Sequence, residues 1–511
     1  MTNPSIGSDE PAPARFGTEL PAPYASVSVL PGTTPTARRG RGLLVAGAAA
    51  SGVALVAAGA WVAQGLLGGG SRADEHLPGT AAVAVLVDLD PSAGQKLGAV
   101  QFAHRFAATD RLDWGATGHD PRQWLYEHLT DRATDAPAWS EIDAWLGKRA
   151  GLAELPPSGS DTQPVTVVAL QVTDVDRATT SLTRGGRAFV AVDGDWVLVS
   201  DTQAHADAAL RTTTSAPLSA SPDFRADLLA IGEPGVADLW VDGPRVSRLA
   251  ATVPGGLAGG LSGVLPAATA GAGTVAGHGA VALRFDGATL ELAGSFRGLG
   301  PDARPSTPHA AVLAPADAAV AVSIAGLGEQ VDRSWPTALE RLGSRGSSVV
   351  TQLQTQTGLQ LPGDLVTLLG SQFTLTLSPA DGRPNLAIRV VTPADPSGPL
   401  DRLTAALAAV VPTVQSHRTS DGYVLALTEQ ASAALADSGG LSTTPAFVAA
   451  VPHAGQADAV AYVDIPLLVQ GYGKGMSEAD KAAIAPLGSL GMSSSRDDGG
   501  GSTFTVRLTT R

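Results

Sequence analysis

The stretch "WVLVSDTQA", Trp196 to Ala204, indicates how the chain is organised, because the chain contains a second copy of it. The copy is "YVLALTEQA", from Tyr423 to Ala431. Four further blocks recur in the same order: "AVAVLVDLD" from Ala82 as "AVAVSIAGL", "IDAWLG" from Ile142 as "LVTLLG", "LSASPDF" from Leu218 as "LSTTPAF", and "ADLWVDGP" from Ala237 as "AVAYVDIP". Repeats at nearly constant spacing indicate a tandem duplication.

Each half predicts the same order of strands and helices. In the first half, "PVTVVALQV" is typical of a strand, "DVDRATTSLTRG" of a helix, "RAFVAVDG" and "WVLVSD" of two paired strands, "QAHADAALRT" of a helix and "VADLWVDG" of a returning strand. This is the strand-helix-strand-strand-helix-strand order of a ferredoxin-like unit, with an extra helix at "SPDFRADLLAIG". A hairpin with its turn at Asp286 and Gly287 closes the half.

The expected fold class is therefore α+β, with antiparallel-rich sheets and helices on one sheet face. Residues 81–298 form the first ectodomain repeat, 299–315 a linker and 316–511 the second repeat. Two such halves commonly leave a cleft between them, and clefts of this kind bind ligands.

A membrane anchor is predicted before the repeats. The 22-residue run from Gly42 to Ala63 carries no charge, and as a helix it would span about 33 Å. Arg38, Arg39 and Arg41 precede it, so the positive-inside rule places the N-terminus in the cytoplasm and the repeats outside the cell. We expect a disordered cytoplasmic tail over residues 1–41, a single transmembrane helix over 42–64 and a flexible stalk over 65–80.

The alternative is a signal peptide that is cleaved after an A-x-A site at Ala58 and Ala60. The run is longer than the apolar region usual in signal peptides, which favours the anchor. Whether the segment is cleaved stays open.

Composition excludes several function classes. The net charge of −14 argues against a nucleic-acid partner, because a phosphate backbone requires a basic face. The chain has no cysteine, which excludes disulfides and thiol chemistry. Lysine occurs only at positions 96, 148, 474 and 481, and the arginine-rich, alanine-rich usage is typical of a GC-rich genome.

The stretch "VLVDLDPSAGQKL", Val85 to Leu97, resembles a phosphate-binding loop at first sight. It lacks the first glycine of G-x-x-x-x-G-K-[ST], Gln95 separates the later glycine from Lys96, and Leu97 stands where Ser or Thr is needed. A helix start explains the stretch better, with Asp90 as N-cap and a proline after it.

Two other strand ends also place an aspartate before a proline, Asp242 before Pro244 and Asp464 before Pro466. The residues left as candidates for ligand binding are Asp90, Ser92, Gln95 and Lys96.

No motif indicates catalysis, a metal ion or a cofactor. "GGLSGV" around Ser262 misses G-x-S-x-G, and "GAGTVAG" from Gly271 lacks the dinucleotide-binding spacing. The nine histidines show no metal-ligand spacing. We expect no catalytic residue, no metal site and no cofactor.

The block "AVAVLVDLDPSAGQKLGAVQFAHRF", with "WLG", "WVLVSDTQAHADAAL" and "PDFRADLL" after it, resembles a mainly actinobacterial membrane-protein family, domain of unknown function 3352. The resemblance spans most of the ectodomain and implies a single-pass protein of the cell envelope, without an assigned activity. The second half departs from it, with "SIAGLGEQ" in place of "VDLDPSAG".

Together these features predict a noncatalytic, membrane-anchored extracytoplasmic protein that binds an envelope lipid, polymer or protein. One alternative is a structural or scaffolding protein acting by protein-protein contacts, with Gly47 and Ser51 in the anchor suited to a homodimer. A further alternative is an enzyme without a recognisable motif. A large apolar cavity would favour the first reading, and a filled interior with an exposed apolar patch the second.

Overall fold

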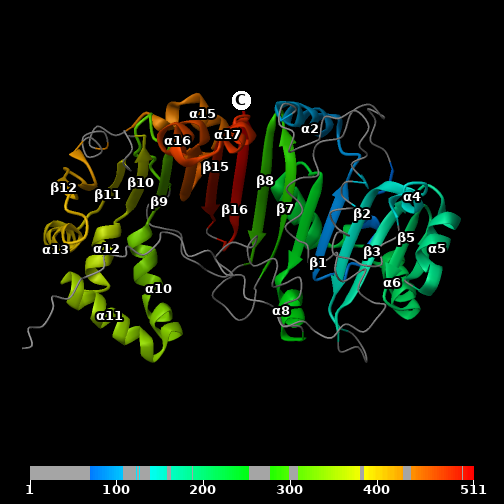
Figure 1. The fold of residues 1–511 in the computed structure, drawn as a ribbon. Helices are drawn as coiled ribbons and strands as arrows, with labels where there is room; N and C mark the ends of the chain where they lie inside the picture. Colours follow the sequence, from blue (N-terminus) through cyan, green and yellow to red (C-terminus); the bar gives the residue numbers. More distant parts are fainter. Residues whose placement is uncertain are drawn as a thin grey trace, which may run out of the picture. The chain divides into compact units, whose positions relative to one another are not determined.

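The described part of the chain is organised around one continuous antiparallel sheet of 16 strands (Figure 1). The structure is a computed structural model. It describes residues 70–106, 122–123, 126, 138–157, 163–186, 188–252, 277–298, 309–379, 385–429, 435, 439–497 and 499–511. The predicted combination of helices with antiparallel strands, the α+β class, is confirmed.

Residues 81–298, called the first half below, and residues 316–511, called the second half, contribute eight strands each. The strands of the first half are β1 (Val83–Asp88), β2 (Leu146–Leu155), β3 (Val165–Val172), β4 (Phe189–Asp193), β5 (Trp196–Ser200), β6 (Ala237–Asp242), β7 (His278–Asp286) and β8 (Thr289–Arg297). Those of the second half are β9 (Val320–Ala325), β10 (Gln372–Ser378), β11 (Asn385–Val391), β12 (Gln415–Arg418), β13 (Gly422–Ala426), β14 (Ala459–Asp464), β15 (Leu487–Arg496) and β16 (Ser502–Thr510).

Equivalent strands occupy equivalent places in the sheet. From one edge inward the order is β4, β5, β3, β2, β1, β6, β7, β8, and from the other edge it is β12, β13, β11, β10, β9, β14, β15, β16. All fifteen neighbouring pairs are antiparallel. The halves meet where β8 pairs with β16, called the seam below, with Phe296 opposite Ser502 and Leu290 opposite Leu508. A backbone ladder therefore joins the two halves.

The predicted ferredoxin-like unit forms only in part. Strands β3, β5 and β4 lie in the expected order, but β1 and β2 stand between β3 and the returning strand β6. Strand β1 buries Val83 on one face and Ala84 and Leu86 on the other. An apolar strand of this kind suits a central position with a partner on each side, which is where β1 pairs with β2 and β6.

Helices cover both faces of the sheet, so the prediction that they lie on one face is wrong. Helices of the first half are α2 (Ala93–Arg105), α4 (Trp139–Ile142), α5 (Val175–Thr183), α6 (Gln203–Ser215), α7 (Pro222–Ile231) and α8 (Gly243–Thr252). Those of the second half are α10 (Leu327–Leu342), α11 (Ser344–Thr357), α12 (Gly363–Leu369), α13 (Ser397–Ala408), α15 (Pro445–Ala450), α16 (Ile465–Tyr472) and α17 (Glu478–Ile484). Because successive strand residues point to opposite faces, the core cluster around Leu86 and Trp240 and the one around Val83 and Val246 lie on opposite sides of the sheet.

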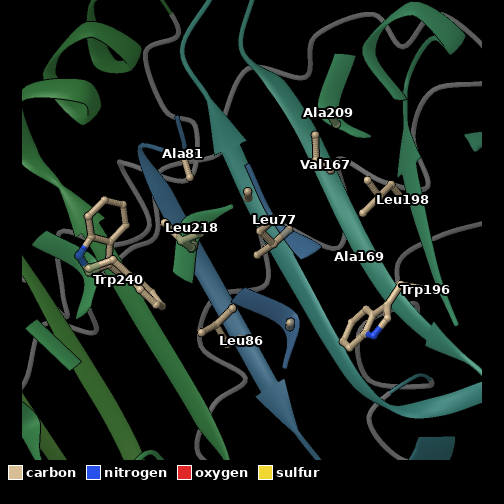
Figure 2. Close-up of a cluster of buried hydrophobic side chains, with 14 of the residues drawn as sticks. Leu77, Ala81, Leu86, Val167, Ala169, Trp196, Leu198, Ala209, Leu218 and Trp240 are labelled. Carbon is tan, nitrogen blue, oxygen red and sulfur yellow. The ribbon is translucent and has the colours of Figure 1, made fainter. Parts of the chain in front are cut away.

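The first described residues, called the N-terminal segment (residues 71–77) below, pack against the sheet. The segment includes the short helix η2 (Ala73–His76), and Leu77 is fully buried in the cluster that contains Leu86 and Trp196 (Figure 2). Trp196 Nε1 donates a hydrogen bond to Ser71 Oγ at 2.8 Å, and the His76 ring stacks on Trp196 with the ring centroids 4.6 Å apart. The prediction of a flexible stalk over residues 65–80 is therefore wrong from Ser71 onward, because its apolar and polar side chains find partners on the sheet.

Several predictions concern residues outside those that the structure describes. These are the cytoplasmic tail, the transmembrane helix over 42–64, the beginning of the stalk and most of the linker. Among the described residues, no helix combines the length and the apolar character needed to cross a bilayer.

Candidate functional site

The four predicted binding residues lie together, where β1 ends and α2 begins. Ser92 is the N-cap of α2: its Oγ accepts the N–H of Gln95 at 3.4 Å and donates to Glu233 Oε1 at 2.8 Å. The prediction that Asp90 caps this helix is wrong. The Asp90 carboxylate pairs with Lys96 instead, and the residue next to the first turn caps it.

Aspartate caps are found at the two other strand ends, as predicted. Asp242 Oδ1 accepts the N–H of Arg245 at 2.9 Å, after β6. Asp464 Oδ1 accepts the N–H of Leu467 at 2.9 Å, at the start of α16. Aspartate therefore caps the helix at two of the three strand ends and Ser92 caps it at the third, so the pattern is architectural.

Gln95 is a buried link between α2 and the sheet. Its Oε1 accepts the backbone N–H of Phe285 in β7 at 2.7 Å, and its side chain is shielded from solvent. A β7 N–H at this position would otherwise be buried without a partner, which costs about 1–3 kcal/mol. Gln95 thus holds the helix in place, and its amide oxygen is already engaged.

Lys96 belongs to a cluster of charges at the same junction. Its Nζ lies 2.7 Å from Asp90 Oδ1, and Lys148 Nζ lies 3.8 Å from the same oxygen. Next to them Arg149 Nε donates to Asp88 Oδ1 at 3.1 Å. The structure brings the predicted residues together and gives each an intramolecular partner, so their arrangement is that of a helix-sheet junction.

The charge cluster continues beneath the N-terminal segment to Asp238, a group that sequence reasoning missed. Asp238 Oδ1 accepts the N–H of Gly235 at 2.8 Å, and its Oδ2 lies 3.8 Å from Arg72. Burial raises the pKa of Asp238 to about 7, and the carboxylates of Asp74 and Asp88 act in the same direction against the hydrogen bond and Arg72.

The sequence did carry a signal for Asp238. In "ADLWVDGP" the Asp occupies a position that faces the core, and the equivalent position of "AVAYVDIP" is Val460, which is buried. Asp238 lies opposite Leu86 in the register of β6 against β1, and directly opposite residues share a sheet face. The presence of Asp238 in the first repeat, where the second repeat has the apolar Val460, was thus a signal of a buried charged group.

A second buried carboxylate, Asp227 of α7, is satisfied at both oxygens. Oδ1 accepts two bonds from the Arg297 guanidinium, at 3.0 and 2.7 Å. Oδ2 accepts from Trp240 Nε1 at 2.9 Å and lies 2.6 Å from His278 Nδ1. Because a carboxylate only accepts, His278 Nδ1 carries a proton. The other ring nitrogen, Nε2, lies 3.7 Å from Asp223 Oδ1.

The second half lacks this set of side chains. Its equivalent positions hold Ala450 for Asp227, Ser489 for His278, Thr509 for Arg297 and Tyr462 for Trp240. Ser489 Oγ bonds to Thr509 Oγ1 at 2.9 Å and donates to the carbonyl of Ala446 in α15 at 3.2 Å. Both halves therefore tie the equivalent helix, α7 or α15, to the sheet, the first by an ion cluster and the second by hydroxyl groups.

The Asp227 set is best described as a structural lock. A carboxylate oriented on His Nδ1 also occurs in catalytic sites, where the other ring nitrogen faces a reacting group. Here His278 Nε2 faces the Asp223 carboxylate, and Arg297 and Trp240 take the remaining acceptor sites of Asp227. No three His, Asp or Glu side chains among the described residues are arranged to hold a metal ion.

A small cavity of about 50 Å³ lies in the second half, at the ends of β9 and β15. Arg333, Arg496 and Asp458 line it among others. Asp458 is buried. Its Oδ2 accepts the N–H of Arg496 at 2.8 Å, whereas its Oδ1 has no hydrogen-bond partner among the residues that the structure describes. The volume suits one or two water molecules and is too small for a lipid or a sugar.

The chain was compared with models of protein families, with curated proteins and with solved structures, and none of them matches. The resemblance to domain of unknown function 3352 therefore stays a prediction.

Proposed function

We propose that this chain is a membrane-anchored extracytoplasmic protein that binds a component of the cell envelope and has no catalytic role. The uncharged run from Gly42 to Ala63, with Arg38, Arg39 and Arg41 before it, supports the anchor and its orientation. The net charge of −14 argues against a nucleic-acid partner, because an acidic protein repels a phosphate backbone.

The observation that carries the proposal is the N-terminal segment. A chain that only needed a tether would leave this segment in solvent. Instead Ser71 accepts hydrogen bonds from Trp196 and Arg149, at 2.8 and 3.4 Å, and Leu77 enters the core. The chain that follows the predicted anchor is thereby fixed against the sheet, which supports a protein that works at a fixed place on the membrane.

The candidate residues support neither a catalytic site nor a ligand site at the junction of β1 and α2. Asp90, Ser92, Gln95 and Lys96 are engaged in capping, in an ion pair and in a helix-sheet bond, and Asp227 is saturated by its neighbours. A general acid or base needs a free position toward a substrate. These groups serve the fold, and the envelope component would bind the outer surface of the protein.

A specific observation supports a second function, scaffolding by protein-protein contact. Edge strand β4 carries two exposed apolar side chains, Phe189 and Val192. The opposite edge, β12, consists of exposed polar residues. An apolar edge strand is suited to accept a strand of another protein, whether a different chain or a second copy in a homodimer.

The test uses the full-length chain in membranes of an actinobacterial host. We expect it to resist alkaline extraction, to be digested by protease added to spheroplasts, and to carry a stoichiometric lipid, glycan or protein when it is solubilised and analysed by native mass spectrometry. Release by alkali would refute the anchor. A chain that stays in the membrane but carries no small molecule would favour scaffolding. In that case a co-purifying protein, or a homodimer of the chain, would identify the partner.

A further inference from the structure

One end of the sheet, called the anchor-proximal end below, receives the chain from the predicted anchor. It is the end at which β1 and β3 finish and β2 and β6 start. The first described residue lies there: a Cβ atom on Gly70 would be 3.2 Å from Arg149 and 3.8 Å from Gln171. The carbonyl of Ser71 accepts a bond from the same arginine, so this attachment is part of the fold.

The length of chain between anchor and sheet limits their separation. The predicted transmembrane helix ends at residue 64, six residues before Gly70. Six residues span at most about 20 Å when fully extended. The anchor-proximal end must therefore lie within about 20 Å of the point where the helix leaves the bilayer.

The antiparallel seam brings elements of the second half to the same end. Leu290 at the start of β8 pairs with Leu508 near the end of β16, and Asp464 at the end of β14 pairs with Ser489. Helix α2 of the first half and α16 and α17 of the second half adjoin these strand ends (Figure 1). Helices α8 and α10 follow strand ends at the opposite end of the sheet.

The surface at the anchor-proximal end has the chemistry of a membrane interface. Helix α16, "IPLLVQGY", is apolar, yet none of its residues is fully buried. Leu97 on α2 is 59% exposed. All four lysines of the chain lie at this end: Lys96 in α2, Lys148 in β2, Lys474 after α16 and Lys481 in α17. Half-exposed apolar side chains bordered by lysines are typical of proteins that rest on lipid headgroups.

Apolar contact outweighs charge in this arrangement. Lys96 pairs with Asp90 at 2.7 Å, and Lys481 pairs with Glu478 at 2.9 Å. Their attraction to lipid phosphate is thus largely offset within the protein. Leu97, by contrast, is mainly exposed, and the apolar side chains of α16 remain partly exposed although the helix packs against β15.

We propose that the anchor-proximal end lies against the lipid headgroups of the membrane that holds the chain, with Leu97 and α16 in contact with the interface. This inference rests on the proposed anchor. It adds a defined membrane-facing surface, with the opposite end of the sheet directed away from the bilayer.

The absence of cysteine makes a direct test straightforward. Single-cysteine variants of the full-length chain, Leu97→Cys and Lys474→Cys, receive an environment-sensitive fluorophore in vesicles of phosphatidylcholine and phosphatidylglycerol. The matched control is Ser420→Cys, an exposed position in the β12–β13 turn at the opposite end. Lipids with a nitroxide on the headgroup should quench the first two labels about twofold or more relative to the control, since interfacial groups sit about 5–10 Å into the headgroup boundary.

Each result decides a separate point. Chain that alkali removes from the vesicles refutes the proposed function itself. Chain that stays inserted but shows equal quenching at all three positions refutes only the membrane-facing surface. A further variant carries a flexible Gly/Ser insert of about 20 residues between positions 69 and 70, which removes the length restraint. If the first two labels are still quenched more than the control in the variant with the insert, the anchor-proximal end contacts the lipid headgroups. If that preference disappears, tether length alone held the anchor-proximal end near the bilayer, and the proposal is overturned.

Discussion

Asp227 and Asp238 are two buried carboxylates, and they distinguish the first half of the protein from the second. Asp227 has no exposed side-chain surface and satisfies both oxygens with cationic or N–H donors. Asp238 is almost as buried but is 3.8 Å from its nearest cation, Arg72, with other carboxylates close by. The two groups therefore have opposite consequences for stability.

Replacing Asp238 with Asn should make the protein less sensitive to pH. The folded pKa of about 7 lies above the unfolded value near 4, so the folded state binds the extra proton between these pH values. The wild-type protein consequently loses stability as pH rises from about 4 through 7, by roughly 2 kcal/mol between pH 5 and 8 after discounting for relaxation. Asp238→Asn should remove most of this pH-dependent loss of stability. Urea unfolding at pH 5 and pH 8, followed by tryptophan fluorescence, measures it. The control is Asp195→Asn, an exposed change of the same charge; an equal effect there would contradict the prediction.

Asp227→Ala should destabilise the protein by about 3 kcal/mol, because breaking a buried ion cluster leaves unpaired charges and donors. The triple variant Asp227→Ala, His278→Ser, Arg297→Thr copies three of the four residues of the second half and removes the unpaired charges, so that only the Trp240 N–H is left without its acceptor. It should therefore unfold at a higher urea concentration than the single variant. Additive losses across the three positions would show that the side chains do not act as a unit.

At the scale of elements, α2 is held to the sheet at several points. Ser92 caps it, Gln95 bonds to β7, and Phe102 packs against Phe285 with ring centroids 5.7 Å apart. Gly98 sits where the helix comes closest to the β7–β8 turn. A Cβ there would lie 2.7 Å from Phe285 Cβ and 2.8 Å from the Gly287 carbonyl oxygen.

Two glycines on this helix should respond in opposite ways to alanine. Gly98→Ala forces the helix away from the sheet, and we expect a loss of about 1–3 kcal/mol. Gly94→Ala meets nothing closer than 3.9 Å and should be neutral or stabilise by about 0.5 kcal/mol through helix propensity. Thermal melting followed by circular dichroism measures both. Equal effects would mean that α2 is not fixed at this contact.

Elements with strong local patterns were predictable from the sequence. The strands at Val165–Val172 and Trp196–Ser200, the helix at Gln203–Ser215 and the hairpin turn at Asp286 are found as predicted. The cap of α2 was predicted two residues early, because Asp90 and Ser92 are both favoured N-cap residues and only the tertiary ion pair of Asp90 with Lys96 decides between them. The N-terminal segment was missed since its partners lie far away in sequence.

At the scale of the whole molecule, the seam converts two repeats into one sheet. Glu291 is buried and links Arg284 of its own half, at 2.6 Å, to Arg507 of the other half, at 2.6 Å. Arg507 also donates to Asp286 at 2.7 Å. The duplication was predictable from the sequence, but this junction was not. The pairing of β8 with β16 is made mainly by backbone groups, and the one complementary charge pair, Glu291 with Arg507, is too little to identify the partner strand from the sequence.

Because the sheet is continuous, calorimetry of the wild-type protein should show one main unfolding transition for both halves. Arg507→Ala removes the cross-half ion pairs while Glu291 keeps Arg284. We expect a loss of about 3 kcal/mol and a transition that splits in two, as each half unfolds separately. Arg511→Ala, at the exposed chain end, is the control. If Arg507→Ala left a single unshifted transition, the ion pairs would contribute nothing to the coupling of the halves.

The seam also bears on the origin of the chain. Pairing of two equivalent strands, antiparallel and side by side, is what a two-fold axis produces between identical subunits. A chain of half this length, ending after β8, would complete the same sheet as a symmetric homodimer. Fusion of two gene copies would release each copy from the requirement to remain identical. The Asp227 lock of one half and the hydroxyl pair of the other are the kind of divergence that only a fused dimer permits.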